Sequence, residues 1–183
     1  MLTTLQQAFI QAIEQLDLEK VKGLLADGLD PNFIEPEKGP PISIICDALF
    51  QWWQPIYDGY EEGKPLSEEE KQQGLAIYLD IMDVLIAAKA NVHLWDSEEF
   101  FGPLWDAASA ACVPAVKRLL DEKVNPNTLD DEGLTILSSI SQLMYECDFD
   151  EIEWEQTWPE EKQTLQLLRE HGAKMTKEMN LTK

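Results

Sequence analysis

One apolar pattern recurs four times along the chain and limits its possible folds more than any other feature. The segment at 116–123 has apolar residues at its first, fourth and fifth positions and reaches a chain reversal after its eighth. Segments 21–28, 82–89 and 165–172 repeat the pattern, although Arg169 interrupts the last copy at its fifth position. This spacing is typical of the end of an amphipathic α-helix. We therefore expect an array of related helical units.

The eighth position of each copy marks the point at which a helix is expected to end. Gly28, Lys89, Lys123 and Gly172 occupy it, at intervals of 61, 34 and 49 residues. Glycine adopts a left-handed backbone without strain, whereas the two lysines must adopt it at some cost or end their helices differently. One interval is close to 33 residues and the other two are longer. The intervals therefore indicate a repeat of about 33 residues with two insertions.

The third copy is the most complete, and it identifies the kind of repeat. Its matching positions are Leu104, Ala107, Ala108, Val116, Leu119, Leu120, Asn125, Asn127, Asp130, Gly133, Thr135 and Leu137. They resemble the ankyrin repeat, with its patterns L-x-x-A-A, V-x-x-L-L, D-x-N and D-x-x-G-x-T-x-L. The first copy ends in Gly28-Leu29-Asp30-Pro31-Asn32, which is similar to the G-A-D-x-N of that family.

One position departs from the family in every copy. The histidine that normally follows T-P-L is absent, and Trp105 and Ser138 occupy its place in the third and fourth copies. The hydrogen bonds that such a histidine supplies between repeats are therefore expected to be missing.

The resemblance implies an all-α fold, an ankyrin-repeat solenoid of about four helix-pair units that forms a single domain over residues 1–183. The units are expected at about 4–32, 40–93, 102–127 and 134–175, with a short tail at 176–183. Each unit is two antiparallel helices that bury their apolar faces only by stacking on neighbouring units. The terminal units also need polar outer faces. The first helix meets this need with Gln6, Gln7, Gln11, Glu14 and Gln15.

The two insertions, at about 51–73 and 145–162, fall between the two helices of the second and fourth units, as extended helices or as loops. Both combine aromatic residues with many carboxylates, and Trp154 and Trp158 are the candidate anchors of the second. Such a composition favours recognition of another protein. The competing interpretation is that the helices are longer here and the aromatic residues pack within the protein. Ser67, with Glu70 completing a capping box, predicts the start of a helix inside the first insertion.

The net charge limits the possible partners. Thirty-five acidic residues against fourteen basic ones give a formal charge of −21. Nucleic acid and anionic membranes are therefore poor partners, and a protein with a basic surface is a good one. The alternative is that the acidity serves solubility alone.

The cysteines and the apolar segments indicate the compartment. Cys46, Cys112 and Cys147 are odd in number and far apart, which fits a reducing environment. The chain has no apolar run of transmembrane length and no recognisable export signal at its start. A cytoplasmic location is expected.

Catalytic and metal-binding patterns do not emerge from the sequence. His93 and His171 lack partners at ligand spacing, and the acidic run at 148–151 lacks the glycine and distal glutamate of a calcium loop. Glycine-rich phosphate loops and nucleophile motifs are absent as well. We expect no enzymatic activity, no cofactor and no metal. The alternative from a different functional class is a small metal-dependent hydrolase. Such an enzyme needs a conserved acidic cluster, which one sequence cannot show.

The best-supported function is a protein-protein interaction module, because ankyrin proteins bind partners with their inner helices and the turns between units. The protein is expected to be monomeric when alone. The residues expected at the binding surface are Phe33, Trp95, Phe100, Phe101 and Trp105, with Asp96, Glu98, Glu99, Asp130, Asp131 and Glu132 along its edge. A short, acidic ankyrin protein is similar to bacterial immunity proteins, many of which neutralise basic toxins. The alternative is a general adaptor or scaffold with an endogenous partner.

Overall fold

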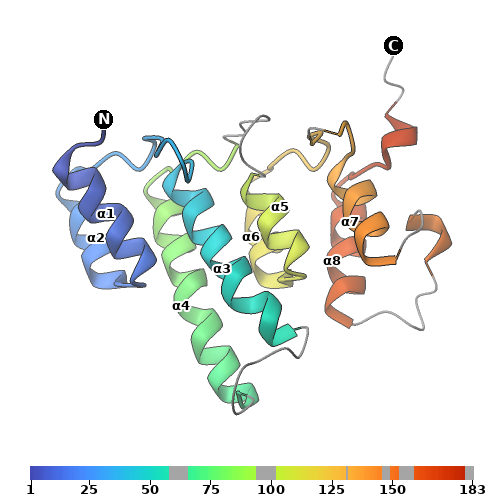
Figure 1. The fold of residues 1–183 in the computed structure, drawn as a ribbon, viewed down its shortest axis with the longest axis horizontal. Helices are drawn as coiled ribbons and strands as arrows, with labels where there is room; N and C mark the ends of the chain where they lie inside the picture. The colour runs from blue at the N-terminus through green and yellow to red at the C-terminus, as the bar shows by residue number, and fades with distance from the viewer. Residues whose placement is uncertain (58–65, 94–101, 131, 146–148, 153–158, 180–183) are drawn as a thin grey trace. The chain divides into compact units, whose positions relative to one another are not determined.

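The protein is helical throughout the part that the computed structural model describes, which is residues 1–57, 66–93, 102–130, 132–145, 149–152 and 159–179. The α-helices in this part are α1 (Thr4–Glu14), α2 (Leu18–Ala26), α3 (Pro41–Tyr57), α4 (Glu68–Ala87), α5 (Pro103–Ser109), α6 (Val113–Asp121), α7 (Ile136–Tyr145) and α8 (Pro159–Glu170). Two short 3₁₀ helices, η1 (Phe149–Glu151) and η2 (Thr176–Glu178), accompany the last pair (Figure 1). The expected all-α class is confirmed.

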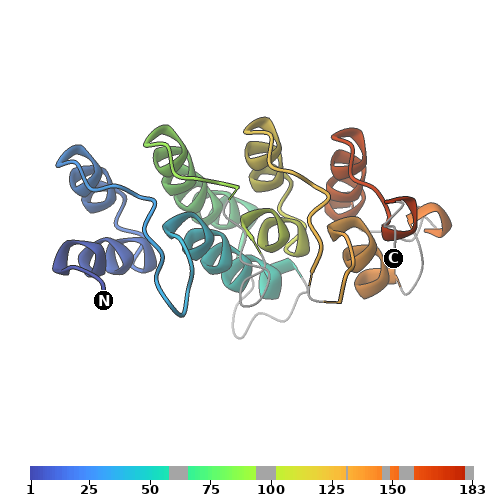
Figure 2. The ribbon, with the colours of Figure 1, turned by 90° about the horizontal axis from the view of Figure 1, so that it is seen from above.

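The chain divides into two compact units, Met1–Leu94 and Trp95–Lys183. In the first unit α1 packs on α2 and α3 on α4, while α1 also contacts α3 and α2 contacts α4. In the second unit α5 pairs with α6 and α7 with α8, with α5 against α7 and α6 against α8 (Figure 2). Within each unit, therefore, like helices of two successive pairs lie side by side. The single domain expected over residues 1–183 stays a prediction.

Each helix pair ends in a residue with left-handed backbone, as predicted for the two glycines, and the two lysines adopt it as well. The φ angles are +90° at Gly28, +65° at Lys89, +62° at Lys123 and +86° at Gly172. After Gly28, the amide of Leu29 donates to the carbonyl of Leu24 at 3.1 Å, and the other three ends make the equivalent bond. The hydrogen bonds are those of a Schellman motif, which satisfies the last carbonyls of a helix. The two lysines thus accept a strain of about 1 kcal/mol each to keep this ending.

The first helix has the polar exterior expected of a terminal unit. Phe9, Ala12 and Ile13 are fully buried, and all of the predicted polar residues are exposed except Gln6, which is half-buried. Gln6 also completes a capping box with Thr3 at the start of α1, so its side chain serves the helix end.

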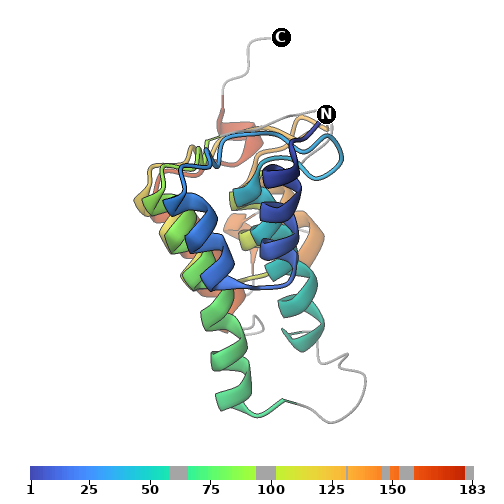
Figure 3. The same cartoon turned by 90° about the vertical axis from the view of Figure 1, so that its left-hand side faces the viewer.

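The second helix pair is longer than the first, with 17 residues in α3 and 20 in α4, and it extends beyond α1 and α2 (Figure 3). Ser67 caps α4 and forms the predicted capping box with Glu70. Inside the extension, the ring of Trp52 stacks on Tyr78 with 5.2 Å between the ring centroids. Trp52 also lies over Gly74, where an added methyl carbon would be 2.6 Å from its Cη2 atom. For Trp52, the structure favours packing within the protein over an exposed interface.

Within the described residues, the helices fall short of the length and apolar character needed to cross a membrane.

Candidate interaction surface

Two turns connect successive helix pairs, one in each compact unit, and they share one construction. The first turn (residues 28–40) follows α2, and the second turn (residues 123–135) follows α6. Each begins with an Asx turn: Asp30 Oδ1 accepts from the amide of Asn32 at 3.0 Å, and Asn125 Oδ1 accepts from that of Asn127 at 3.0 Å. Such local hydrogen bonds limit the conformations that the turns can adopt.

A single asparagine braces each turn against the end of the next helix pair in its unit. Asn32 Nδ2 donates to the carbonyl of Lys89 at 3.1 Å, and its Oδ1 accepts from the amide of Asn91 at 2.7 Å. Asn127 repeats this arrangement, with Nδ2 donating to the carbonyl of Gly172 at 2.9 Å and Oδ1 accepting from the amide of Lys174 at 2.8 Å. Asn32 and Asn127 therefore each join two neighbouring helix pairs.

The first turn is held against α1, yet it presents an apolar side chain to solvent. Phe33 is half-buried and lies edge-on to Phe9, with 6.2 Å between the ring centroids. Glu35 and Gly39 exchange two backbone hydrogen bonds of 3.0 and 2.9 Å. Ile34, between these anchors, is 54% exposed. Phe33 is thus partly accessible, and its role in binding stays a prediction, while Ile34 beside it is exposed.

A salt bridge ties the end of the first turn to the end of α1. The ammonium of Lys38 pairs with the carboxylate of Glu14, and both side chains are partly exposed. This hydrogen bond raises the pKa of Lys38 above its usual value, so the lysine is charged at neutral pH. Because its nearest carboxylate balances it, the lysine adds little positive charge to the turn.

The second turn uses one of its predicted acidic residues to hold its own shape. Asp130 is half-buried, and its Oδ1 accepts from the amide of Leu134 at 2.7 Å, while its own amide donates to the carbonyl of Leu134 at 2.9 Å. Gly133 adopts a φ of +78° to close the turn. Glu132 is exposed. Asp130 therefore stabilises the conformation of the turn, whereas the carboxylate of Glu132 is exposed to solvent.

Trp105 was expected on the binding surface, and that expectation is wrong. Its side chain is only 4% exposed, and Nε1 donates to Thr128 Oγ1 at 3.3 Å. The ring is therefore buried, and its indole nitrogen is bonded to the second turn. The remaining predicted residues lie outside the described part of the chain: Trp95, Asp96, Glu98, Glu99, Phe100, Phe101, Asp131, Trp154 and Trp158.

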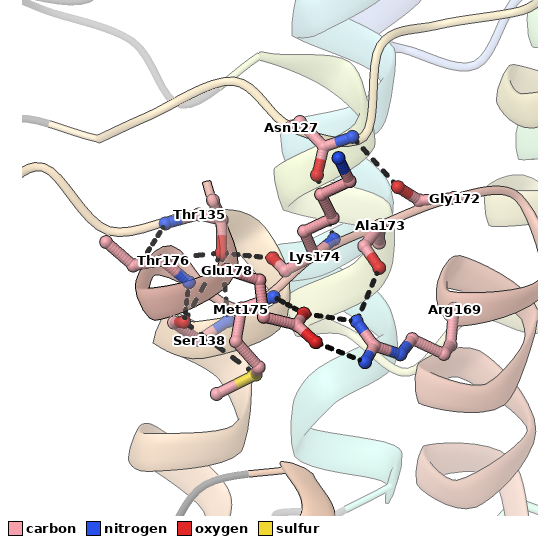
Figure 4. A network of polar contacts seen from close by, with 10 residues as sticks. All are labelled: Asn127, Thr135, Ser138, Arg169, Gly172, Ala173, Lys174, Met175, Thr176 and Glu178. Atoms are coloured by element: carbon pink, nitrogen blue, oxygen red, sulfur yellow. Dashed lines mark hydrogen bonds and ion pairs between the residues drawn. The ribbon is translucent and has the colours of Figure 1, made fainter. Parts of the chain in front are cut away.

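Ser138 makes hydrogen bonds in the fourth pair that the sequence did not predict. Ser138 Oγ accepts from the amide of Thr176 at 2.8 Å and from Thr135 Oγ1 at 3.3 Å (Figure 4). Thr135 Oγ1 also lies 2.7 Å from the carbonyl of Lys174. Trp105 and Ser138 thus each bond to a neighbouring segment, Trp105 to Thr128 and Ser138 to Thr176.

Arg169, which interrupts the repeated pattern, holds the segment after α8 in place. Its guanidinium makes two hydrogen bonds to Glu178, of 2.5 and 2.7 Å, and one of 3.0 Å to the carbonyl of Ala173 (Figure 4). It also lies over the ring of Phe149, 5.5 Å from the centroid. The bonds from Arg169 and from the amide of Met175 lower the pKa of Glu178 to about 2. Arg169 therefore links η1, α8 and η2.

Groups of three or more histidine, cysteine or acidic side chains suited to a metal ion do not occur within the described part of the chain. Cys112 is only 1% exposed, and burial raises the pKa of its thiol to about 11. A thiol in this environment is a poor nucleophile.

Neither protein-family models nor curated proteins match this chain.

Proposed function

We propose that this chain is a protein-binding module of the ankyrin-repeat kind, which neutralises a protein with a basic surface. The observation that carries the proposal is the repeated construction of the two turns, each braced by one asparagine against the following helix pair. A surface held in this way loses little conformational entropy when a partner binds, so more of the contact energy becomes affinity. The packing of like helices against each other within each compact unit also supports a repeat architecture.

The formal charge of −21 supports a basic partner. Complementary charge accelerates association towards about 10⁸–10⁹ M⁻¹s⁻¹ at low salt, whereas uncharged pairs associate at about 10⁵–10⁶ M⁻¹s⁻¹. Fast capture is what an inhibitor of a harmful enzyme requires. This reasoning favours an immunity protein over a general adaptor, for which speed brings less advantage.

The test begins with capture of partners on the immobilised protein from the cells that produce it, followed by purification of each captured protein. Binding of each is then measured by stopped-flow at 50 and 300 mM salt, with polylysine as the control for unspecific attraction. We expect a one-to-one complex with a basic protein and an association rate that falls steeply with salt. Failure to capture a protein that binds stoichiometrically, or an acidic partner with a salt-independent rate, would contradict the proposal.

Toxicity distinguishes an immunity protein from an adaptor. Expression of the captured partner alone should arrest growth, and co-expression of this chain should restore it. A partner that is harmless alone would favour the adaptor.

A further inference from the structure

Among the side chains whose exposure the structure describes, the large apolar ones that are exposed all belong to the first helix pair and its turn. They are Met1, Leu5 and Ile34. Leu5 is 60% exposed in the first turn of α1, and Ile34 is 54% exposed on the first turn between pairs. Both belong to the first compact unit.

The contact between Phe9 and Phe33 relates Leu5 to Ile34. Leu5 precedes Phe9 by four residues, so the two lie on the same side of α1. Phe33 lies against Phe9 at 6.2 Å between the ring centroids, and Ile34 is the next residue in the chain. Leu5 and Ile34 therefore flank one aromatic contact, and with the half-buried Phe33 we call them the apolar patch.

The apolar patch is held in an exposed position by its neighbours. Asn32 is fixed to the loop at 89–91, and Glu35 is bonded to Gly39, so the backbone on both sides of Ile34 is held while its side chain stays exposed. Exposure of this kind leaves apolar area in contact with water, which a binding partner would remove.

The charge around the apolar patch selects the kind of partner. The helix α1 contains no basic residue, and Glu37 and Asp30 are exposed beside the patch. The basic residue of the turn, Lys38, is balanced by Glu14. Glu35 and Glu37 also act on Lys38, so carboxylates outnumber the one lysine here. A cationic rim on the partner would meet this excess of carboxylates, whereas an acidic rim would be repelled.

We infer that the apolar patch of Leu5, Phe33 and Ile34 docks a protein segment in which an aliphatic or aromatic side chain is flanked by lysine or arginine. The inference rests on the proposed function and assigns it a place and a partner chemistry. The apolar side chain of the segment covers Ile34 and Leu5, and its basic neighbours pair with the carboxylates of the turn.

The test is an NMR titration of the ¹⁵N-labelled full chain with a twelve-residue peptide that has one leucine between arginine and lysine residues. We expect shifts centred on the amides at 33–39 and the start of α1. Ile34→Asp and Leu5→Asp should each weaken binding at least about tenfold, which is the loss typical of an interface anchor. Both positions are exposed, so the variants should fold, and Ile34→Val is the matched control that should bind within about threefold.

Replacement of the peptide leucine with glycine separates the apolar contact from simple charge attraction, and it should weaken binding as much as Ile34→Asp does. Shifts spread over the whole acidic surface, binding unchanged in both aspartate variants, or no binding at millimolar peptide would each overturn the inference. If the captured protein partner binds the Ile34→Asp variant as tightly as the native chain, the apolar patch is wrong while the proposed function stands. If no protein partner binds the native chain, the proposed function itself fails.

Discussion

Replacement of Gly74 with alanine tests whether the aromatic stack in the long second helix pair stabilises the fold. Gly74 lies in α4, and an added methyl carbon would be 2.6 Å from Cη2 of Trp52 and closer still to its Cζ2. Carbon atoms at van der Waals contact are about 3.5–4.0 Å apart, so the indole ring must move. The move would disturb its stacking on Tyr78, which has 5.2 Å between the ring centroids.

Three contributions determine the size of the effect. Alanine in a helix interior is more stable than glycine by about 0.8–1 kcal/mol. Overpacking costs about 1–3 kcal/mol, and loss of an aromatic pair costs about 0.5–1.5 kcal/mol. We therefore expect Gly74→Ala to lower the free energy of unfolding by about 0.5–4 kcal/mol, because the two losses exceed the gain in helix propensity.

Gly23 provides the matched control. It also lies inside a helix, α2, but an added methyl carbon there would have no neighbouring atom within 4 Å. Gly23→Ala should therefore raise the free energy of unfolding by about 0.5–1 kcal/mol. The two identical substitutions should thus change stability in opposite directions.

The assay is urea unfolding followed by circular dichroism, with near-ultraviolet spectra to report on the tryptophan environment. Trp52→Leu, made together with Gly74→Ala, should recover part of the lost stability, because the smaller side chain leaves room for the methyl group. If Gly74→Ala stabilises the protein as much as Gly23→Ala does, the proposed packing of Trp52 against α4 is wrong.

Three further predictions concern the Arg169–Glu178 ion pair, the asparagines that brace the two turns, and the buried thiol of Cys112. Arg169→Met should lower stability by about 1 kcal/mol; because Arg169 and the amide of Met175 together lower the pKa of Glu178 from its usual 4.5 to about 2, this stabilisation is present above pH 4.5 and is lost as the pH falls toward 2. The difference in thermal unfolding between variant and native chain should therefore shrink between pH 5 and pH 3, and a constant difference would contradict the ion pair. Asn32→Ala and Asn127→Ala should each cost about 1–2 kcal/mol and speed hydrogen exchange of the amide that the asparagine holds in the neighbouring pair, whereas unchanged exchange would exclude the bracing role. Cys112, as the single retained cysteine, should react with a thiol reagent at pH 8 only at the rate of unfolding, since burial raises its pKa to about 11; rapid reaction in the native state would refute its burial.

The sequence determines the ends of the helices, because those ends depend on residues close together in the chain. Ser67 and Glu70 define the start of α4 from a spacing of three residues. Gly28 ends its helix in the left-handed conformation, as its residue type indicates, and Lys89 takes the strained one of the two endings that the sequence left open. The net charge is likewise a property of the sequence alone.

Only the tertiary structure decides which side chains remain accessible, because burial depends on residues far apart in the chain. Trp105, an aromatic residue that fits a binding surface by its type, is covered and bonded to Thr128. Arg169, an interruption of the pattern in sequence, becomes the link to Glu178 once η2 folds back on α8. Ile34 stays exposed in a turn that Phe33 and Asn32 anchor to α1 and to the loop after α4, and no local pattern records those distant contacts.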